Sequence, residues 1–202
     1  MYSNLKVVIT GGPCSGKSSL INALTKNGFD TVPEQAITVI EQLIQTWGKD
    51  AFTKWKALNM SAFQQIIFNT QHKIESQIPH QQFCFLDRGL LDPIAYLTHY
   101  QLPIPQKVLS IAKQASYDMV IVCDTLAHFD HRKDTGRTET QAESKQIAHT
   151  ISQTYLQHGF PVIRLYEDSL EGRLGSILAL IKQLSSKSLP FDQIPLARHI
   201  IK

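Results

Sequence analysis

The sequence predicts an α/β fold, in which helices cover both faces of a parallel β-sheet. The first observation is that short apolar runs alternate along the chain with longer stretches of helical periodicity. The second is that the runs at residues 83–86 and 119–123 are apolar throughout and too short for helices, as is typical of parallel strands buried on both faces. The third is a length of 202 residues with 43% hydrophobic composition, which fits one globular domain.

The elements of the N-terminal half follow from local patterns. Residues 5–10 (LKVVIT) form a β-branched run that ends in a Gly-Gly-Pro loop, and a helix is expected over residues 17–27, ended by Gly28. Residues 29–33 form a weaker second strand. Two further helices are expected at 35–47 and near 61–78, with apolar faces made of Ile37, Ile40, Ile44 and Trp47 and of Phe63, Ile66, Ile67 and Ile74.

The C-terminal half continues the alternation. The strands at 83–86 and 119–123 are each followed by an aspartate, and helical patterns near 90–100 and 106–116 separate them. Thr140 with Glu143 then forms a capping box that opens a helix ended by Gly159, and residues 160–165 form a fifth strand. Asp168 with Glu171 opens a last helix, to about residue 184. We therefore predict a single domain over residues 1–184 and a C-terminal tail over 185–202.

Charge and cysteine content narrow the functional classes. The 20 Lys and Arg residues against 17 Asp and Glu give a net charge of only +3. The basic residues are dispersed except around residues 132–137, so no nucleic-acid partner is expected. No apolar run approaches the ~18 residues of a membrane span, and no membrane partner is expected. The odd number of cysteines favours free thiols in a reducing compartment, and the N-terminus lacks the pattern of a secretory signal. The expected location is the cytoplasm.

The loop after the first strand carries the strongest functional signal. Residues 11–18 match the pattern Gly-x-x-x-x-Gly-Lys-Ser/Thr in full, between a predicted strand and a predicted helix. Such a P-loop cradles nucleotide phosphates with backbone N–H groups at a helix N-terminus, its lysine reaches the β- and γ-phosphates, and its hydroxyl ligates Mg²⁺. The residues expected to bind the nucleotide are Gly11, Gly12, Pro13, Cys14, Ser15, Gly16, Lys17, Ser18 and Ser19. Cys14 is expected to be a small filler, although a helix N-terminus could lower the pKa of its thiol.

A second Mg²⁺ ligand is expected from an acidic residue at the end of a neighbouring strand. Both Asp87 and Asp124 follow buried strands. We favour Asp87, because Arg88 follows it directly and can place a guanidinium beside phosphate oxygens, whereas Asp124 is followed by Thr-Leu-Ala. The expected cofactors are therefore ATP and Mg²⁺, with Ser18 and Asp87 as metal ligands.

The P-loop together with the stretch at residues 87–96 (DRGLLDPIAY) resembles the P-loop nucleoside and nucleotide kinases. It is most similar to the small AAA-like ATPase/kinase family, which is related to bacterial nicotinamide-riboside kinase domains and to thymidylate kinases. The resemblance covers residues 6–180 or so and implies a three-layer P-loop NTPase fold, with a five-stranded parallel sheet in the order 2-3-1-4-5.

The resemblance also implies roles for residues outside the loop. The segment Val32-Pro33-Glu34 is similar to one in deoxynucleoside kinases, which makes Glu34 a candidate general base, with a helix N-terminal acid as the alternative. Arg88 would contact the transferring or acceptor phosphoryl group. The polar segment near 128–139 stands where these kinases have a mobile lid, whose arginines would be Arg137 and Arg132; a solvated basic loop is the alternative.

Two functions remain open at this point. The first is an ATP- and Mg²⁺-dependent kinase acting on a small nucleoside-like or nucleotide-like acceptor. Asp92 stands where thymidylate kinases have a serine, and its carboxylate would face the phosphate of a nucleotide acceptor, which argues against such an acceptor. Equally, Asp92 could cap the next helix. The second is a regulatory ATPase, in which Glu34 orients water. The sequence does not distinguish a monomer from a homodimer.

Overall fold

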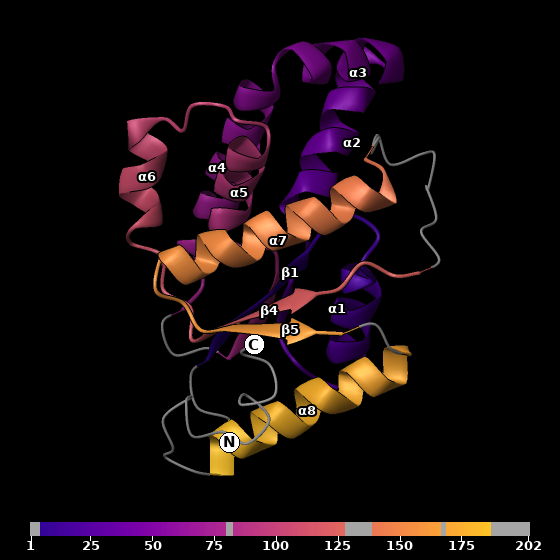
Figure 1. The fold of residues 1–202 in the computed structure, drawn as a ribbon, viewed down its shortest axis with the longest axis vertical. Helices are drawn as coiled ribbons and strands as arrows, with labels where there is room; N and C mark the ends of the chain where they lie inside the picture. Colours follow the sequence, from indigo (N-terminus) through magenta and orange to yellow (C-terminus); the bar gives the residue numbers. More distant parts are fainter. Residues whose placement is uncertain (1–4, 80–82, 128–138, 167–168, 187–202) are drawn as a thin grey trace.

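The five-stranded parallel sheet that was predicted is present in the computed structural model, which describes residues 5–79, 83–127, 139–166 and 169–186. Its strands are β1 (Lys6–Gly11), β2 (Thr31–Val32), β3 (Cys84–Asp87), β4 (Met119–Cys123) and β5 (Val162–Leu165). They lie in the order β2-β3-β1-β4-β5, so the expected order is confirmed. Figure 1 shows β1, β4 and β5 at the centre of the molecule.

The register of the sheet brings the ends of three strands together. Ile9 of β1 lies opposite Asp87 of β3, and Gly11 at the end of β1 lies opposite Cys123 of β4. All pairs are parallel, so the carboxyl ends of β1, β3 and β4 share one edge of the sheet. The loops that follow these strands, including the P-loop, therefore meet at this edge.

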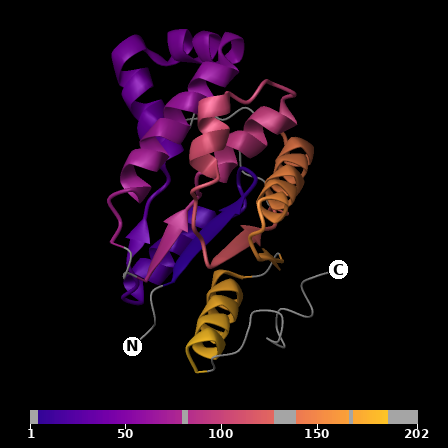
Figure 2. The same ribbon diagram turned by 90° about the vertical axis from the view of Figure 1, so that its left-hand side faces the viewer.

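Helices cover both faces of the sheet, which makes three layers (Figures 1 and 2). One face packs against α1 (Lys17–Lys26) and α8 (Leu170–Ser186), and the other against α4 (Met60–Glu75), α5 (Leu91–His99), α6 (Gln106–Ala112) and α7 (Gln141–Gln157). Successive strand residues point to opposite faces, so Val7 and Ile9 join the first core while Val8 joins the second. Burying both faces explains why these strands are apolar throughout.

A third, smaller core lies among helices alone. Helix α2 (Gln35–Trp47) and α3 (Lys49–Leu58) pack with α4, and in Figure 1 they project beyond the sheet. The buried residues of this core are Val39, Ile40, Phe52, Phe63 and Ile67. The predicted face of α2 was only partly right, because Trp47 is 43% exposed and stacks edge-on against Trp55 instead. Helix α3 was not predicted, since its sequence carries only Phe52 and Lys56 as buried positions.

Several predicted boundaries differ from the structure. Helix α4 ends at Glu75 rather than near residue 78, and α6 ends at Ala112 rather than near 116. The predicted capping box of Thr140 and Glu143 is confirmed at the start of α7. Helix α8 begins at Leu170, after Ser169 accepts a hydrogen bond from the Gly172 N–H, and it continues to Ser186. Asp168, predicted to open α8, lies outside the described residues.

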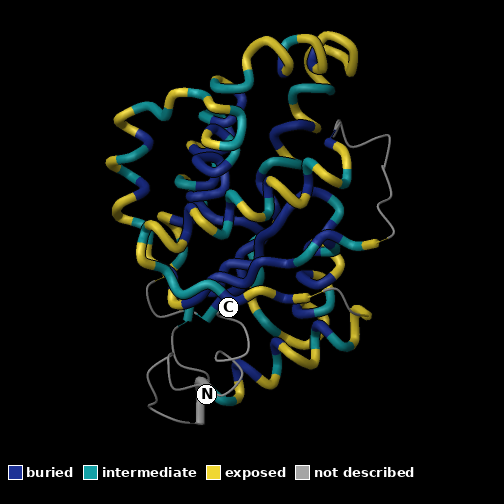
Figure 3. The backbone as a smooth tube through the Cα atoms, viewed as in Figure 1, coloured by how far each residue is buried: buried dark blue, intermediate teal, exposed yellow. Residues whose placement is uncertain are grey.

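The sheet is buried between its helical layers, and the exposed positions lie mainly on the outer surfaces of the helices (Figure 3). Within the described ranges, none of the helices combines the length and the apolarity that crossing a membrane requires.

Candidate functional site

The P-loop lies between β1 and α1, where only glycine fits at two positions. Gly11 has φ of +139°, and a Cβ there would lie 2.4 Å from the Cys123 carbonyl oxygen. A Cβ on Gly12 would lie 2.1 Å from the Ser144 carbonyl oxygen of α7. Both neighbours are backbone atoms, which cannot move aside as a flexible side chain can. The two glycines therefore let the loop pass close to β4 and α7 before it turns into α1.

Lys17 is buried at the start of α1 and lies against its own loop. Its Nζ donates to the Gly12 carbonyl at 2.7 Å and to Ser15 Oγ at 2.9 Å. Ser15 Oγ in turn donates to the Gly12 carbonyl at 2.9 Å. An ammonium held this way can exchange its loop contacts for phosphate oxygens that enter the loop, at the positive end of the α1 dipole.

Two residues that sequence reasoning missed hold the P-loop in place. Arg173 of α8 is buried and donates to the carbonyl oxygens of Ser15 at 2.6 Å, Asp124 at 3.1 Å and Tyr166 at 3.0 Å. Ser144 of α7 donates to the Pro13 carbonyl at 2.6 Å. No local pattern marks Ser144, and both residues act through a contact more than 100 positions away in sequence. For Arg173, the available signal was an arginine inside a predicted amphipathic helix.

Asp87 lies beside the P-loop hydroxyl that was predicted to share a metal with it. Ser18 Oγ donates to Asp87 Oδ2 at 3.3 Å, and Asp87 Oδ1 is buried without a hydrogen-bond partner. Burial and the nearby Glu34 carboxylate raise the pKa of Asp87 to about 6. A buried carboxylate oxygen without a partner beside a hydroxyl fits Mg²⁺, which prefers oxygen ligands. Asp124 differs, because its carboxylate accepts from Arg164 Nε at 2.6 Å.

Arg88 links the P-loop to Glu34 and Asp92. Its Nε donates to Glu34 Oε1 at 2.7 Å, and its Nη1 donates to Asp92 Oδ1 at 2.9 Å and to the Gly11 carbonyl at 3.3 Å. All three side chains are buried, so this is a fully desolvated charge cluster rather than a surface ion pair. Arg88 has φ of +72°, a conformation in the left-handed region that non-glycine residues seldom adopt.

Asp92 lies in the first turn of α5 but is not its N-cap, because Leu90 takes that position and no side chain caps it, so the capping alternative is wrong. The Asp92 Oδ2 accepts from the Gly89 N–H at 3.2 Å and from Tyr155 OH at 2.8 Å. Its Oδ1 accepts from Arg88 and from Thr10 Oγ1 of β1. Four donors therefore surround this carboxylate, which fixes it and the Arg88 guanidinium relative to β1.

A pocket opens beside this cluster, between α2, α3, α4 and α5. The pocket is partly open to solvent, and Glu34, Arg88 and Asp92 line one end. The apolar walls of the pocket are formed by Met60, Phe63 and Ile67. Lys56 and Glu139 also line it, and Lys56 Nζ lies 3.9 Å from Glu139 Oε1. Gln64 is buried at the pocket, where its amide nitrogen donates to the Met60 sulfur at 3.6 Å. Such a mixture of apolar walls and a few polar groups suits a small organic molecule.

Of the remaining predicted site residues, some lie in the P-loop and the first turn of α1, and the others lie outside the described residues. Cys14 is half-buried with φ of +54°, and its carbonyl accepts from the Leu126 N–H at 3.4 Å. Ser18 and Ser19 are exposed in the first turn of α1. Cys14, Cys84 and Cys123 are all described by the structure, and none of them forms a disulfide. Arg132 and Arg137 lie outside the described residues.

Comparison with known proteins places this arrangement among P-loop kinase folds. A model of the family described as "AAA domain" matches residues 6–173. A search of curated proteins found no match. Among solved structures, deoxyadenosine kinase from M. mycoides with bound dCTP has 16% identity and a TM-score of 0.63, with 89% of this chain and 100% of that chain covered.

Two further solved structures extend the comparison. Thymidylate kinase from Ehrlichia chaffeensis has 11% identity and a TM-score of 0.61, with 88% of this chain and 98% of that chain covered. The NadR protein in complex with NAD and AMP-PNP has 13% identity and a TM-score of 0.64; the match covers 93% of this chain and 51% of that one. At these identities the likeness shows a shared fold.

Proposed function

We propose that this chain, which belongs to the AAA-domain family, is an ATP- and Mg²⁺-dependent kinase that phosphorylates a hydroxyl group of a small nucleoside-like acceptor. The observation that carries the proposal is that one guanidinium joins the two halves of the site. Arg88 donates to the Gly11 carbonyl of the P-loop and to Glu34 at the end of the pocket. A phosphate donor in the loop and an acceptor in the pocket would therefore both lie against Arg88.

On the nucleotide side, the chain supplies backbone N–H groups of residues 11–18 and the Lys17 ammonium to the phosphates. Ser18 and Asp87 would hold Mg²⁺, which when bound neutralises the charge that develops on the phosphate oxygens. Lys17, Arg88 and the α1 N-terminus add positive charge around the same position. Phosphoryl transfer depends mainly on such placement and charge stabilisation.

On the acceptor side, Glu34 is the group placed to take the proton. The acceptor hydroxyl oxygen forms a bond to the γ-phosphorus, the bond from that phosphorus to the bridging oxygen of ADP breaks, and the hydroxyl proton moves to the Glu34 carboxylate. The Arg88 Nε contact at 2.7 Å fixes the direction in which this carboxylate points. Glu34 is also the N-cap residue of α2, but its side chain makes no capping hydrogen bond there, which favours the catalytic role.

The charge balance around Arg88 favours a nucleoside-like acceptor over a nucleotide-like one. Glu34 and Asp92 already occupy Nε and Nη1 of the guanidinium. A phosphate monoester entering here would have to displace a carboxylate or lie next to two of them, and like charges at such a distance repel. A neutral acceptor meets no such penalty, and the buried Gln64 amide offers it both a donor and an acceptor.

Arg137, and after it Arg132, remain our proposed lid arginines, which would close over the phosphates. If closure brings Arg137 to the transferring group only in the transition state, Arg137→Ala lowers turnover while ATP affinity stays nearly constant. Titration of Mg-ATP alongside turnover measurements tests this, and an equal loss in both quantities would identify Arg137 as a residue that only binds ground-state ATP.

The test of the proposed function is ³¹P NMR of the protein with Mg-ATP, alone and with pooled nucleosides, nucleoside monophosphates and nicotinamide riboside. A phosphomonoester signal that depends on the nucleoside-type pools, and is lost in Lys17→Ala, supports the kinase. A new diphosphate signal from the monophosphates would contradict the acceptor assignment. Inorganic phosphate alone, unaffected by every pool, would support the regulatory ATPase instead.

Glu34→Gln sharpens the test, with Glu41→Gln on the exposed face of the same helix as the matched control. General-base catalysis is typically worth about 10²–10⁴-fold, so Glu34→Gln is expected to lower phosphomonoester formation by at least about 100-fold. Its Mg-ATP-dependent rise in melting temperature should remain, because the P-loop is unchanged. Wild-type transfer in Glu34→Gln would refute its role as the base.

A further inference from the structure

The backbone turn that carries Arg88 adopts a conformation that its own sequence does not favour. Residues 88–90 connect β3 to α5, and Arg88 stands there with φ of +72°. A residue with a Cβ is held in this region only where its surroundings impose it. The Arg88 N–H continues the sheet by donating to the Ile9 carbonyl at 3.0 Å, so the contacts that impose the turn must lie after this point.

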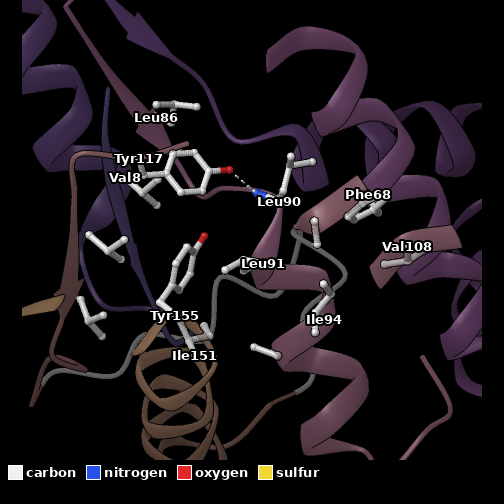
Figure 4. Close-up of a cluster of buried hydrophobic side chains, with 14 of the residues drawn as sticks. Val8, Phe68, Leu86, Leu90, Leu91, Ile94, Val108, Tyr117, Ile151 and Tyr155 are labelled. Carbon is white, nitrogen blue, oxygen red and sulfur yellow. Dashed lines mark hydrogen bonds between the residues drawn. The ribbon is translucent and has the colours of Figure 1, made fainter. Parts of the chain in front are cut away.

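Three backbone groups of the turn are bound by side chains from other elements. The Arg88 carbonyl accepts from Gln71 Nε2 of α4 at 3.2 Å, and the Gly89 N–H donates to Asp92. The Leu90 N–H donates to the hydroxyl of Tyr117, which precedes β4, at 2.8 Å. Figure 4 shows this last bond, with the Tyr155 hydroxyl directed to the same region. The path of the turn is therefore set by tertiary contacts.

Glu75 ties two of these side chains together. Its Oε1 accepts from Gln71 Nε2 at 2.7 Å, and its Oε2 accepts from Tyr117 OH at 2.8 Å. Gln71, Glu75 and Tyr117 are all buried. Gly89 fits against this group closely, because a Cβ there would lie 2.8 Å from the Tyr117 hydroxyl and 2.7 Å from the Tyr155 hydroxyl.

Such a network is a costly way to fill a protein core. Apolar side chains of similar volume would pack here without desolvating an amide, a carboxylate and a hydroxyl, and they would often be as stable. The polar groups all converge on the one turn that orients the guanidinium joining the two halves of the site. This convergence points to a role in placing Arg88.

We propose that Gln71, Glu75 and Tyr117 are positioning residues that hold residues 88–90 so that the Arg88 guanidinium faces Glu34 and the P-loop at once. The expected effect of these residues on catalysis rests on the proposed function. The structural content of the proposal, the orientation of Arg88, is independent of which reaction the protein catalyses.

Gln71→Met is the variant that tests the proposal, because methionine keeps the length of the side chain and removes the donor to the Arg88 carbonyl. With pooled nucleosides and Mg-ATP as the probe, we expect turnover to fall at least tenfold while KM for ATP stays within twofold. In a ¹⁵N–¹H spectrum, the Arg88 Nε–H signal, assigned by its loss in Arg88→Lys, should shift because its bond to Glu34 is disturbed.

Gln65→Met is the matched control, since Gln65 lies on the same helix and its amide, among the residues that the structure describes, donates only to Ser61. It should change neither turnover nor the Arg88 signal. Tyr117→Phe is the second variant; it removes only the hydroxyl that binds Leu90 and Glu75, so it should reproduce both effects of Gln71→Met.

The proposal is overturned if Gln71→Met and Tyr117→Phe are folded and leave the Arg88 Nε–H signal where the wild type has it. It is also overturned if their turnover falls no further than that of Gln65→Met. Absence of phosphomonoester from the wild-type protein would defeat the proposed function instead, and in that event the Arg88 signal still decides whether these residues position the guanidinium.

Discussion

The nucleotide side and the acceptor side of the site are built in different ways. On the nucleotide side, eight consecutive residues form a loop whose backbone faces the ligand, and its shape depends on glycines pressed against β4 and α7. On the acceptor side, charged side chains from the start of α2, the end of β3 and the start of α5 meet in a buried cluster. A backbone site depends on the space around it, whereas a side-chain site depends on charge pairing.

This difference predicts which substitutions each side tolerates. Adding even one carbon to the loop should be harmful, while changing a loop side chain that faces no phosphate should not be. In the charge cluster, the shape of a side chain matters less than its charge, because each buried ion is compensated by its neighbours.

Asp92→Asn should have the largest effect on stability. The substitution keeps the shape but removes one of the two carboxylates that pair with Arg88, and it turns a donor toward Thr10, Tyr155 or Gly89. Breaking a buried pair costs about 3–5 kcal/mol, which lowers the melting temperature of a chain this size by about 10 °C. Calorimetry checks the value, and an unchanged melting temperature would show that the cluster does not need its charge.

Gly12→Ala should act on the nucleotide side with a comparable but smaller cost. The added Cβ would lie 2.1 Å from the Ser144 carbonyl, so the loop must move, and overpacking of this kind costs about 1–3 kcal/mol. Mg-ATP should then no longer raise the melting temperature. The control is Gly175→Ala in α8, where nothing lies within 4 Å of the new Cβ. If Gly12→Ala binds Mg-ATP with the affinity of the wild type, the conformation of the P-loop does not depend on its close packing against α7.

Glu75→Gln tests the polar network behind the acceptor side through its pH dependence. Burial raises the pKa of Glu75 to about 7 from its usual value of 4.5, so its contribution to stability is present below pH 4.5 and is lost as the pH rises to 7. The largest slope from one such group is about 1.4 kcal/mol per pH unit.

Urea-unfolding curves of Glu75→Gln measured between pH 5 and 7 should therefore show a smaller slope than the wild type, and the slope that remains below pH 6 comes from Asp87, whose pKa is raised to about 6. Glu41→Gln, which changes an exposed carboxylate on α2, should keep the wild-type slope. Equal slopes in all three proteins would mean that Glu75 does not titrate in this range when folded.

Cys14→Ala should have the smallest effect, although the residue lies within the P-loop. The hydrogen bond that Cys14 makes with Leu126 uses its backbone carbonyl, and its thiol is not needed for it. Affinity for Mg-ATP, measured by calorimetric titration, should stay within about threefold, less than about 0.7 kcal/mol. A larger loss would show that the thiol takes part in binding.

The sequence predicted the sheet because its signals are local. Apolar runs such as residues 119–123 are buried on both faces in any parallel sheet, so their composition alone identified them. The P-loop was predictable for the same reason, since its glycines and Lys17 are consecutive. Helix α3 and the true face of α2 were missed because the small core that they form with α4 includes the buried cation Lys56 and leaves Trp47 exposed.

The sheet, its phosphate-binding loop and the candidate residues Glu34, Asp87, Arg88 and Asp92 could all be identified from the sequence. The contacts of these residues follow from the packing of the elements. Arg88 joins Glu34 to the P-loop, Arg173 and Ser144 anchor the loop, and Gln71, Glu75 and Tyr117 surround the turn at 88–90. Local patterns record backbone geometry and burial, which repeat every few residues. Hydrogen bonds between distant side chains depend on how the elements pack, and no spacing along the chain encodes them.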